Sequence, residues 1–119
     1  MRNYPVSVLN KPNSQTQTGD AIWVGQSVAA SFTALNGDAT AAGTLKIQGS
    51  NEIPVGSPDK YVPSSASFAD IPSATSAIAA GIGPAIVLAT MNFQYIRAVY
   101  TRSGGGSTTI LVNMSALAV

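Results

Sequence analysis

Apolar and polar residues alternate in short stretches along the chain, and turn-forming residues separate these stretches. The two-residue period is clearest at Val6–Val8 and Leu45–Ile47, and it is typical of strands with one buried face. Val28–Leu35 is rich in residues that favour strands, and it ends at the turn sequence Asn36-Gly37-Asp38. Further short strands are expected at Ile22–Val24, Phe68–Ile71 and Ala85–Leu88.

The last third of the chain contains the strongest strand signals. Aromatic and β-branched residues occupy both faces of Phe93–Thr101, which predicts a central strand covered on both sides. Arg102–Ser107 is rich in glycine and predicts a hairpin connection. A closing strand is expected from Thr108 onward, with its inward face formed by Ile110, Val112 and Met114.

Polar or proline-rich segments between the expected strands predict loops. The two longest are Lys11–Asp20 and Glu52–Pro63. Ser73–Ala80 is expected to be strand or irregular, because its Ser, Thr and Ile residues weaken the helix preference of Ala. This pattern predicts an all-β, antiparallel, jelly-roll-like β-sandwich with an extended N-terminal arm. Residues 1–20 would form that arm or an edge strand, and residues 21–119 a single β-sandwich domain.

The composition points away from catalysis and toward assembly. The 119 residues include six Lys and Arg and five Asp and Glu, or 9% charged side chains, whereas roughly 25% is usual. Hydrophobic residues make up 45%, which argues against disorder. There is no Cys and no His, which excludes disulfides, thiolate zinc sites and Ser-His or Cys-His relays. A surface with so few charges is expected to be covered by other protein.

Several partners and locations are not expected from the sequence. The net charge of +1 provides no basic surface for nucleic acid. Residues 1–5 lack the apolar core of a secretory signal. The uncharged stretch Ile71–Ile96 contains Gly81, Gly83 and Pro84 and is built largely of small residues, so we do not expect a membrane-spanning helix.

The carboxylates show no spacing that predicts a catalytic or metal site. A glycosidase needs two carboxylates held at a fixed separation, and no such pair stands out. Loop oxygens of Asp38, Glu52 and Asp59 are of the type that binds Ca²⁺, but they do not match an EF-hand. We therefore expect no enzymatic activity, no cofactor and no metal.

Aromatic and arginine side chains are the candidate contact residues, because these types are enriched at interface hot spots. Arg97 and Arg102 flank Tyr100, and Tyr95 lies two residues before Arg97. These residues fit a subunit or glycan contact, and equally arginine stems that lie over aromatic neighbours in a sheet. The full set of candidate interface residues is Tyr4, Trp23, Tyr61, Tyr95, Arg97, Tyr100 and Arg102.

Three motifs in fixed order resemble a group of small bacteriophage virion proteins with a β-sandwich core. They are the strand end Gly43–Asn51, the step Phe68–Pro72 and the aromatic strand Asn92–Arg102, which a glycine-rich hairpin and a final strand follow. The resemblance spans roughly residues 28 to 117. Glu52 stands where that group usually has Asp, and Phe68 where Trp is common. The resemblance implies a β-sandwich fold and a place in the virion.

Composition and resemblance together predict a non-enzymatic structural protein of a phage particle. The most specific expectation is a capsid decoration, cement or minor capsid protein, whose partners are further copies of itself and other capsid or virion proteins. The N-terminal arm and the Glu52–Pro63 loop would reach these neighbours. The alternative is a receptor- or carbohydrate-binding module of a phage spike or fibre, which would bind a glycan through exposed aromatic side chains.

Overall fold

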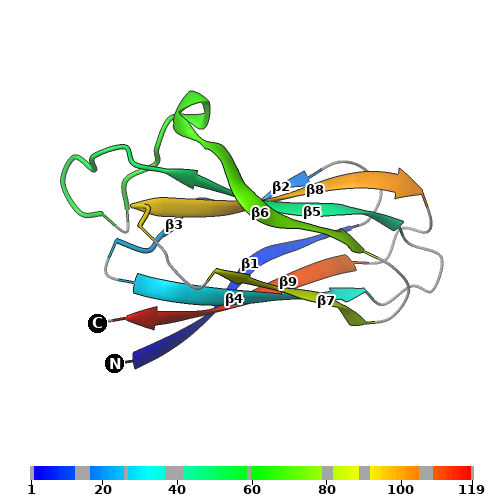
Figure 1. Cartoon of the computed structure of the whole chain (residues 1–119). Coiled ribbons are helices and arrows are strands. Elements are labelled where there is room, and N and C mark those ends of the chain that lie inside the picture. The colour runs from blue at the N-terminus through cyan, green and yellow to red at the C-terminus, as the bar shows by residue number, and fades with distance from the viewer. Residues whose placement is uncertain are drawn as a thin grey trace.

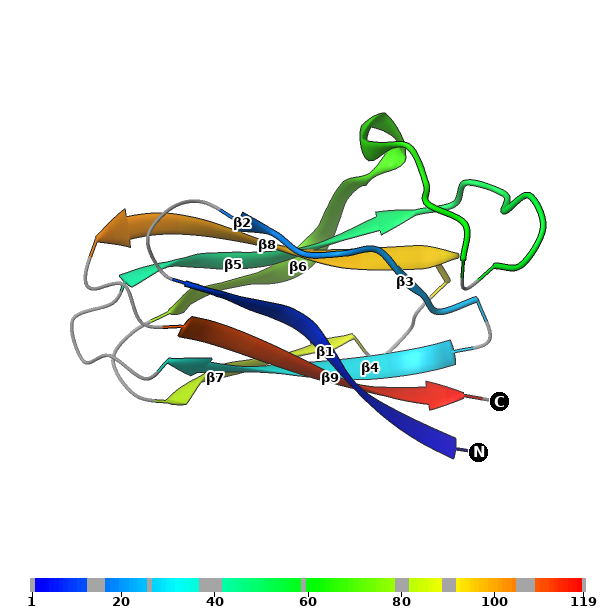
Figure 2. The same cartoon turned by 180° about the vertical axis from the view of Figure 1, so that it is seen from behind.

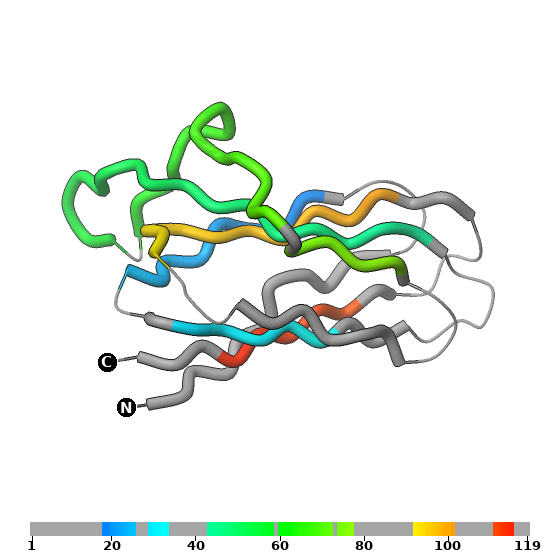
Figure 3. The backbone as a smooth tube through the Cα atoms, viewed as in Figure 1, coloured from blue at the N-terminus to red at the C-terminus, as the bar shows by residue number. Residues whose placement is uncertain are grey.

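The computed structural model describes nine strands and one short 3-10 helix. The strands are β1 Arg2–Pro12, β2 Gln17–Thr18, β3 Ile22–Trp23, β4 Ser27–Asn36, β5 Ala42–Ser50, β6 Ala69–Ile78, β7 Ile82–Leu88, β8 Tyr95–Gly104 and β9 Thr109–Ala118, and the helix is η1 Ser65–Ser67. The described residues are 2–12, 17–25, 27–36, 42–58, 60–78, 82–88, 92–104 and 109–118. Side chains are described for 18–25, 29–33, 43–58, 60–72, 74–77, 92–101 and 111–115, the coloured stretches of Figure 3.

The strands form two antiparallel sheets that pack face to face (Figure 1). One sheet has the order β1-β9-β4-β7, and the other has the order β2-β8-β5-β6 with β3 also paired to β8. β2 and β3 act as one interrupted strand, because between them the Gly19 amide still donates to the Ala98 carbonyl at 2.8 Å. If β2 and β3 are counted as one strand, the pairs are β1 with β9, β2 and β3 with β8, β4 with β7, and β5 with β6. This pairing defines a jelly roll and confirms the predicted all-β sandwich.

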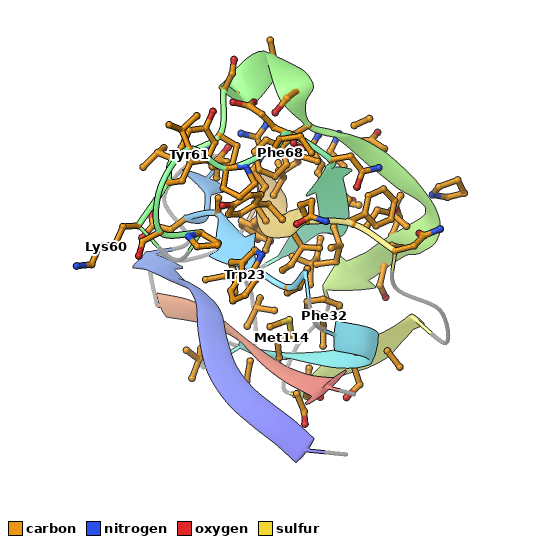
Figure 4. The ribbon with its side chains drawn as sticks, turned by 90° about the vertical axis from the view of Figure 1, so that its left-hand side faces the viewer. Trp23, Phe32, Lys60, Tyr61, Phe68 and Met114 are labelled. Atoms are coloured by element: carbon orange, nitrogen blue, oxygen red, sulfur yellow. The ribbon has the colours of Figure 1, made fainter. Side chains whose placement is uncertain are left out.

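The core lies between the sheets and is built from the alternate residues that the sequence pattern placed inward. Leu45 and Ile47 of β5 are buried, and so are Val112 and Met114 of β9. Phe32 of β4 joins them, and Figure 4 shows Phe32 and Met114 meeting in the space between the sheets. The two-residue period therefore predicted the buried faces of β5 and β9. The side chain of Ile110, the third residue expected on the inner face of β9, lies outside the described residues.

β8 is a central strand buried on both faces, as predicted. Ile96, Ala98 and Tyr100 point into the core between the sheets. Tyr95 and Val99 lie on the opposite, outer face and are also buried. An outer face of a sandwich is normally wet, so something from this chain must cover the Tyr95 end of β8.

Proline positions explain where the predicted strand boundaries are wrong. The strand expected to end before Pro72 continues through it in β6, and Lys11, expected to begin a loop, belongs to β1, whose last residue is Pro12. β7 likewise contains Pro84. β1, β6 and β7 are all edge strands, in which every second N–H points away from the sheet, so proline can be accommodated there without loss of a ladder hydrogen bond. The strand alternative for Ser73–Ala80 is confirmed as far as Ile78.

The N-terminal segment is part of the sheet framework. β1 pairs with β9 from Arg2 opposite Ala118 to Pro12 opposite Thr109. Figure 2 shows β1 along the edge of its sheet, with both chain ends at the same end of the sandwich. Gln17 and Thr18, which were expected to lie in a loop, pair instead with Tyr100 and Val99 of β8.

Candidate interaction surface

The long connection between β5 and β6, residues 51–68, covers one end of the outer face of the β2-β8-β5-β6 sheet (Figures 1 and 2). We call it the β5–β6 loop. Pro54, Pro58 and Pro63 prevent regular strand pairing, and Gly56 adopts a positive φ of 82° that favours glycine. A loop of this length stays in place only if specific contacts hold it, and its polar side chains supply them.

Glu52 joins the outgoing and returning arms of the loop. Its carboxylate accepts a hydrogen bond from the Tyr61 hydroxyl and a second one, of 2.9 Å, from the Ser64 amide. The Tyr61 hydroxyl, then the Ser67 hydroxyl and the Ser64 amide, lower the pKa of Glu52 below its ordinary value of 4.5. The same contact raises the pKa of Tyr61 above its ordinary value of 10.0. The ionised carboxylate and the neutral phenol are therefore the stable pair at neutral pH.

Three serines fix the base of the loop. The Glu52 amide donates to Ser50 Oγ at 3.2 Å, and Ser50 Oγ lies 2.8 Å from Ser67 Oγ. Ser67 Oγ in turn donates to the Ser64 carbonyl at 2.6 Å, so Ser50 must be the donor to Ser67. Ser50 is buried at the end of β5. These bonds satisfy its hydroxyl completely and tie η1 to the end of that strand.

Tyr95 forms the floor beneath the loop and is only 1% exposed. Its hydroxyl donates to the Pro58 carbonyl at 2.6 Å, and its ring centroid lies 6.2 Å from that of Tyr61 at an angle of 50°. Such a tilted pair is a favourable aromatic arrangement. The Gln94 amide, next to Tyr95, donates to the Ser50 carbonyl at 3.0 Å and so aligns the start of β8 with the end of β5.

A polar row across three strands holds the η1 side of the loop. Arg97 of β8, Gln48 of β5 and Asp70 of β6 lie opposite one another. Arg97 Nε donates to Gln48 Oε1 at 2.7 Å, and Gln48 Nε2 donates to Asp70 Oδ1 at 2.9 Å. The Gln48 hydrogen bond, and then Lys46 at 3.2 Å, lower the pKa of Asp70.

Arg97 also contacts the β5–β6 loop directly. Its guanidinium carbon lies 4.2 Å from the centroid of the Phe68 ring, and its Nη1 donates to Ser65 Oγ at 3.0 Å. Arg97 therefore connects β8 to both η1 and the residue that follows it. Figure 4 shows Phe68 and Tyr61 above the sheet, on the side away from Phe32 and Met114.

Three large aliphatic side chains of the loop are turned to solvent: Ile53 is 75% exposed, Val55 80% and Val62 82%. We call these three residues the apolar patch. Ile53 follows Glu52 and Val62 follows Tyr61, so the patch lies on both arms beside the contact that joins them. Burial of one such side chain in an interface contributes about 1.5–3 kcal/mol. Part of the loop's mobility is already removed by its polar contacts, which lowers the entropic cost of binding.

The structure brings together three of the seven residues expected at an interface. Tyr61, Tyr95 and Arg97 all contact or support the β5–β6 loop. Tyr100 lies on the opposite face of β8, fully buried in the core, because it is an odd number of residues from Tyr95. The rings of Tyr95 and Tyr100 are thus both covered by this chain, and neither is on the surface.

The other expected contact residues do not join this cluster. Trp23 pairs with Tyr95 at the sheet edge and is half-buried, and its buried Nε1 has no hydrogen-bond partner among the described residues. Tyr4 and Arg102 lie in β1 and β8, opposite Ala116 and Gly43, and their side chains are outside the described set.

Sequence reasoning named the loop as a contact segment but missed the residues that shape it. Glu52 was considered as a calcium ligand, whereas here it is the acceptor for Tyr61 and Ser64. The apolar patch was not singled out, although branched aliphatic residues in a proline-rich loop are a recognisable signal of exposure. Among the described residues, no three His, Cys, Asp or Glu side chains gather as a metal site, and no helix is long and apolar enough to span a membrane.

The fold is similar to that of a prophage-derived protein. No family model matches the chain, and no curated protein matches its sequence. The structure is similar to the crystal structure of the SPBc2 prophage-derived protein YomS, with a TM-score of 0.53 and 8% sequence identity. The match covers 97% of this chain and 92% of that chain. The two proteins therefore share their fold over nearly their whole length.

Proposed function

We propose that this chain is a non-enzymatic structural protein of a bacteriophage particle, a capsid decoration, cement or minor capsid protein. It would associate with further copies of itself and bind the shell through the β5–β6 loop. The observation that carries this proposal is the apolar patch, whose three side chains are 75–82% exposed on a loop that polar contacts hold in place.

Exposed aliphatic side chains on an ordered loop favour a protein partner. A mobile loop with the same residues would lose conformational entropy on binding, at a cost of roughly 0.5–1.5 kcal/mol for each side chain immobilised. Here the Glu52, Ser50 and Tyr95 contacts have already restricted the loop. The apolar surface is therefore available for burial against an apolar recess of another subunit.

Two further observations support a phage particle as the setting. The fold is shared with the prophage-derived protein YomS, and jelly rolls are common among viral capsid domains. The chain has only 9% charged residues, so charge repulsion does little to keep its surface from associating with other proteins. A third observation supports the non-enzymatic part of the proposal: the sequence has no His or Cys to serve as a catalytic base or thiol nucleophile.

The test combines the association state of the pure protein with its presence in particles. Light scattering of the wild-type chain is expected to show a defined oligomer, and phage particles purified from the strain that carries the gene are expected to contain the chain after washing. The triple variant Ile53→Ser, Val55→Ser, Val62→Ser should fold normally but fail to associate with particles. Lys60→Ser is the matched control, because Lys60 is an exposed residue of the same loop outside the patch.

Two results would contradict the proposal. The first is a monodisperse monomer that is never found in particles. The second is a triple variant that stays bound to particles as well as the Lys60→Ser control. A monomer with saturable binding to a cell-surface glycan would instead support the receptor-binding alternative.

A further inference from the structure

We propose that the Glu52–Tyr61 contact is an acid-operated clasp, which holds the β5–β6 loop closed at neutral pH and releases its apolar patch from that fixed arrangement in acid. The consequence for particle binding rests on the function proposed above. The clasp itself rests on how the loop is built.

Glu52 is the described side chain that joins the two arms directly. It lies on the outgoing arm, and both of its donors, Tyr61 and the Ser64 amide, lie on the returning arm. The tip between them is closed by a turn of its own, in which the Lys60 and Tyr61 amides donate to the Ser57 carbonyl at 3.1 Å each. Opening the clasp therefore separates the returning arm from the outgoing arm at Glu52, while the Tyr95 hydroxyl still holds the Pro58 carbonyl.

Protonation is expected to open this contact because the carboxylate acts only as an acceptor. Each of its oxygens receives one donated hydrogen, from Tyr61 and from Ser64. A proton added to either oxygen removes the charge that strengthens both bonds and competes with one donor for its place. The lowered pKa of Glu52, caused first by the Tyr61 hydroxyl, agrees with this direction.

The sign of the pH dependence follows from that shift. A carboxyl group with a folded-state pKa below its ordinary 4.5 stabilises the closed loop fully above pH 4.5. This stabilisation is lost as the pH falls through the lowered value. Tyr61 has a raised pKa and keeps its proton throughout the acid range, so Glu52 is the member of the pair that titrates there.

The other ionisable side chains near the loop can be tested separately. Tyr95 lies beneath Tyr61, and Arg97 contacts η1 through Ser65. Lys60 on the tip is exposed. Among the described residues, Asp70 is the second carboxylate of the region, and it supports Arg97 through Gln48. Asp59 is a further carboxylate in the sequence of the loop and lies outside the described residues. Each of these two acids requires a control of its own, Asp70→Asn and Asp59→Asn.

The experiment measures amide hydrogen exchange of residues 53–62 in the free wild-type chain, from neutral pH to below 4.5, after correction for intrinsic exchange. We expect the corrected exchange rate to rise about tenfold for each unit by which the pKa of Glu52 is depressed. Asp70→Asn and Asp59→Asn should each show the same rise. Glu52→Gln keeps the size of the side chain and one acceptor oxygen but cannot titrate, so its exchange should be independent of pH over this range.

Two outcomes would overturn the clasp: a wild-type loop whose exchange does not rise below pH 4.5, or a Glu52→Gln loop that follows the wild-type transition. If Glu52→Gln does not fold, Tyr61→Phe is the substitute. It removes one donor, so its acid transition should be smaller and should occur at a higher pH than in the wild type.

Particle binding at the same pH values separates the clasp from the proposed function. Loss of binding together with loop opening supports both. Loop opening with unchanged binding supports the clasp but contradicts the loop as the contact surface. A loop that stays closed overturns the clasp whatever the particles do.

Discussion

Gly43 is the position in β5 where the packing between strand and core can be tested by a single added methyl group. A Cβ atom at Gly43 would lie 2.5 Å from the Thr101 carbonyl oxygen and 2.5 Å from the Cε1 and Cζ atoms of the Tyr100 ring. Ordinary contact begins at 3.4 Å, so Gly43→Ala requires a displacement of about 0.9 Å. The substitution therefore measures how closely β8 approaches β5.

Neither neighbour can move easily. Tyr100 is fully buried in the core, and Thr101 lies opposite Thr44 in the β5–β8 ladder. Overpacking of this kind typically costs about 1–3 kcal/mol, and a backbone neighbour places the cost at about 2–3 kcal/mol. Replacing glycine restricts the unfolded chain, which offsets about 0.5–1 kcal/mol. We expect a net loss of about 1–2.5 kcal/mol in the free energy of unfolding.

Urea denaturation measures this loss as a lower midpoint with an unchanged slope. Thr44→Ala is the matched control, because Thr44 is the next residue of β5 and is exposed on the outer face. Its effect should stay within about 0.5 kcal/mol. A Gly43→Ala protein as stable as the wild type would mean that Tyr100 does not cover Gly43, and the register of β5 against β8 would have to be revised.

Three further substitutions test the loop. Ser50→Ala removes the hydroxyl that donates to Ser67, and the free energy of unfolding should fall by about 1–3 kcal/mol, since a buried donor–acceptor chain is broken; an unchanged urea midpoint would contradict the serine network. Tyr95→Phe should cost about 1 kcal/mol and raise hydrogen exchange in the loop, because the Pro58 carbonyl loses a donor; exchange equal to the wild type would argue against this contact. Gly56→Ala should cost about 1–2 kcal/mol from its φ of 82° alone, because no atom lies within 4 Å of the added methyl group; a neutral effect on the urea midpoint would show that the turn adapts.

The fold could be predicted largely from the sequence, because the signals that define strands are local. Alternation placed Leu45 and Val112 on the inner face, and the two-sided pattern of β8 identified a central strand. The boundary errors in β1 and β6 fall at prolines. The sequence predicts a break at Pro72, but whether proline ends a strand depends on whether that strand lies at a sheet edge. Sheet order is set by contacts distant in sequence, so a local pattern does not contain it.

The site could be predicted only in part, for a related reason. The composition of the β5–β6 loop predicts a contact segment, but the partners of Glu52 depend on how the loop turns back. Tyr61 and Ser64 are nine and twelve residues away, at no fixed period. Tyr95 and Tyr100 could have been separated in advance, because residues an odd number apart on a strand face opposite sides. That rule would have kept Tyr95 with Arg97 and assigned Tyr100 to the core.

Most of the charged side chains that the structure describes make contacts within the chain. Among the described charged side chains, Lys46, Glu52, Asp70 and Arg97 all bind groups that position the β5–β6 loop or the strands beneath it. Charges committed to such contacts do little to hydrate the surface, and the loop that they hold presents aliphatic side chains to solvent. Among the described charged side chains, Lys60 is the one on that loop's exposed tip, where it lies in the same loop as three exposed aliphatic side chains. The arrangement here favours a loop shaped for contact, and this is why the patch, more than the overall composition, supports a role in assembly.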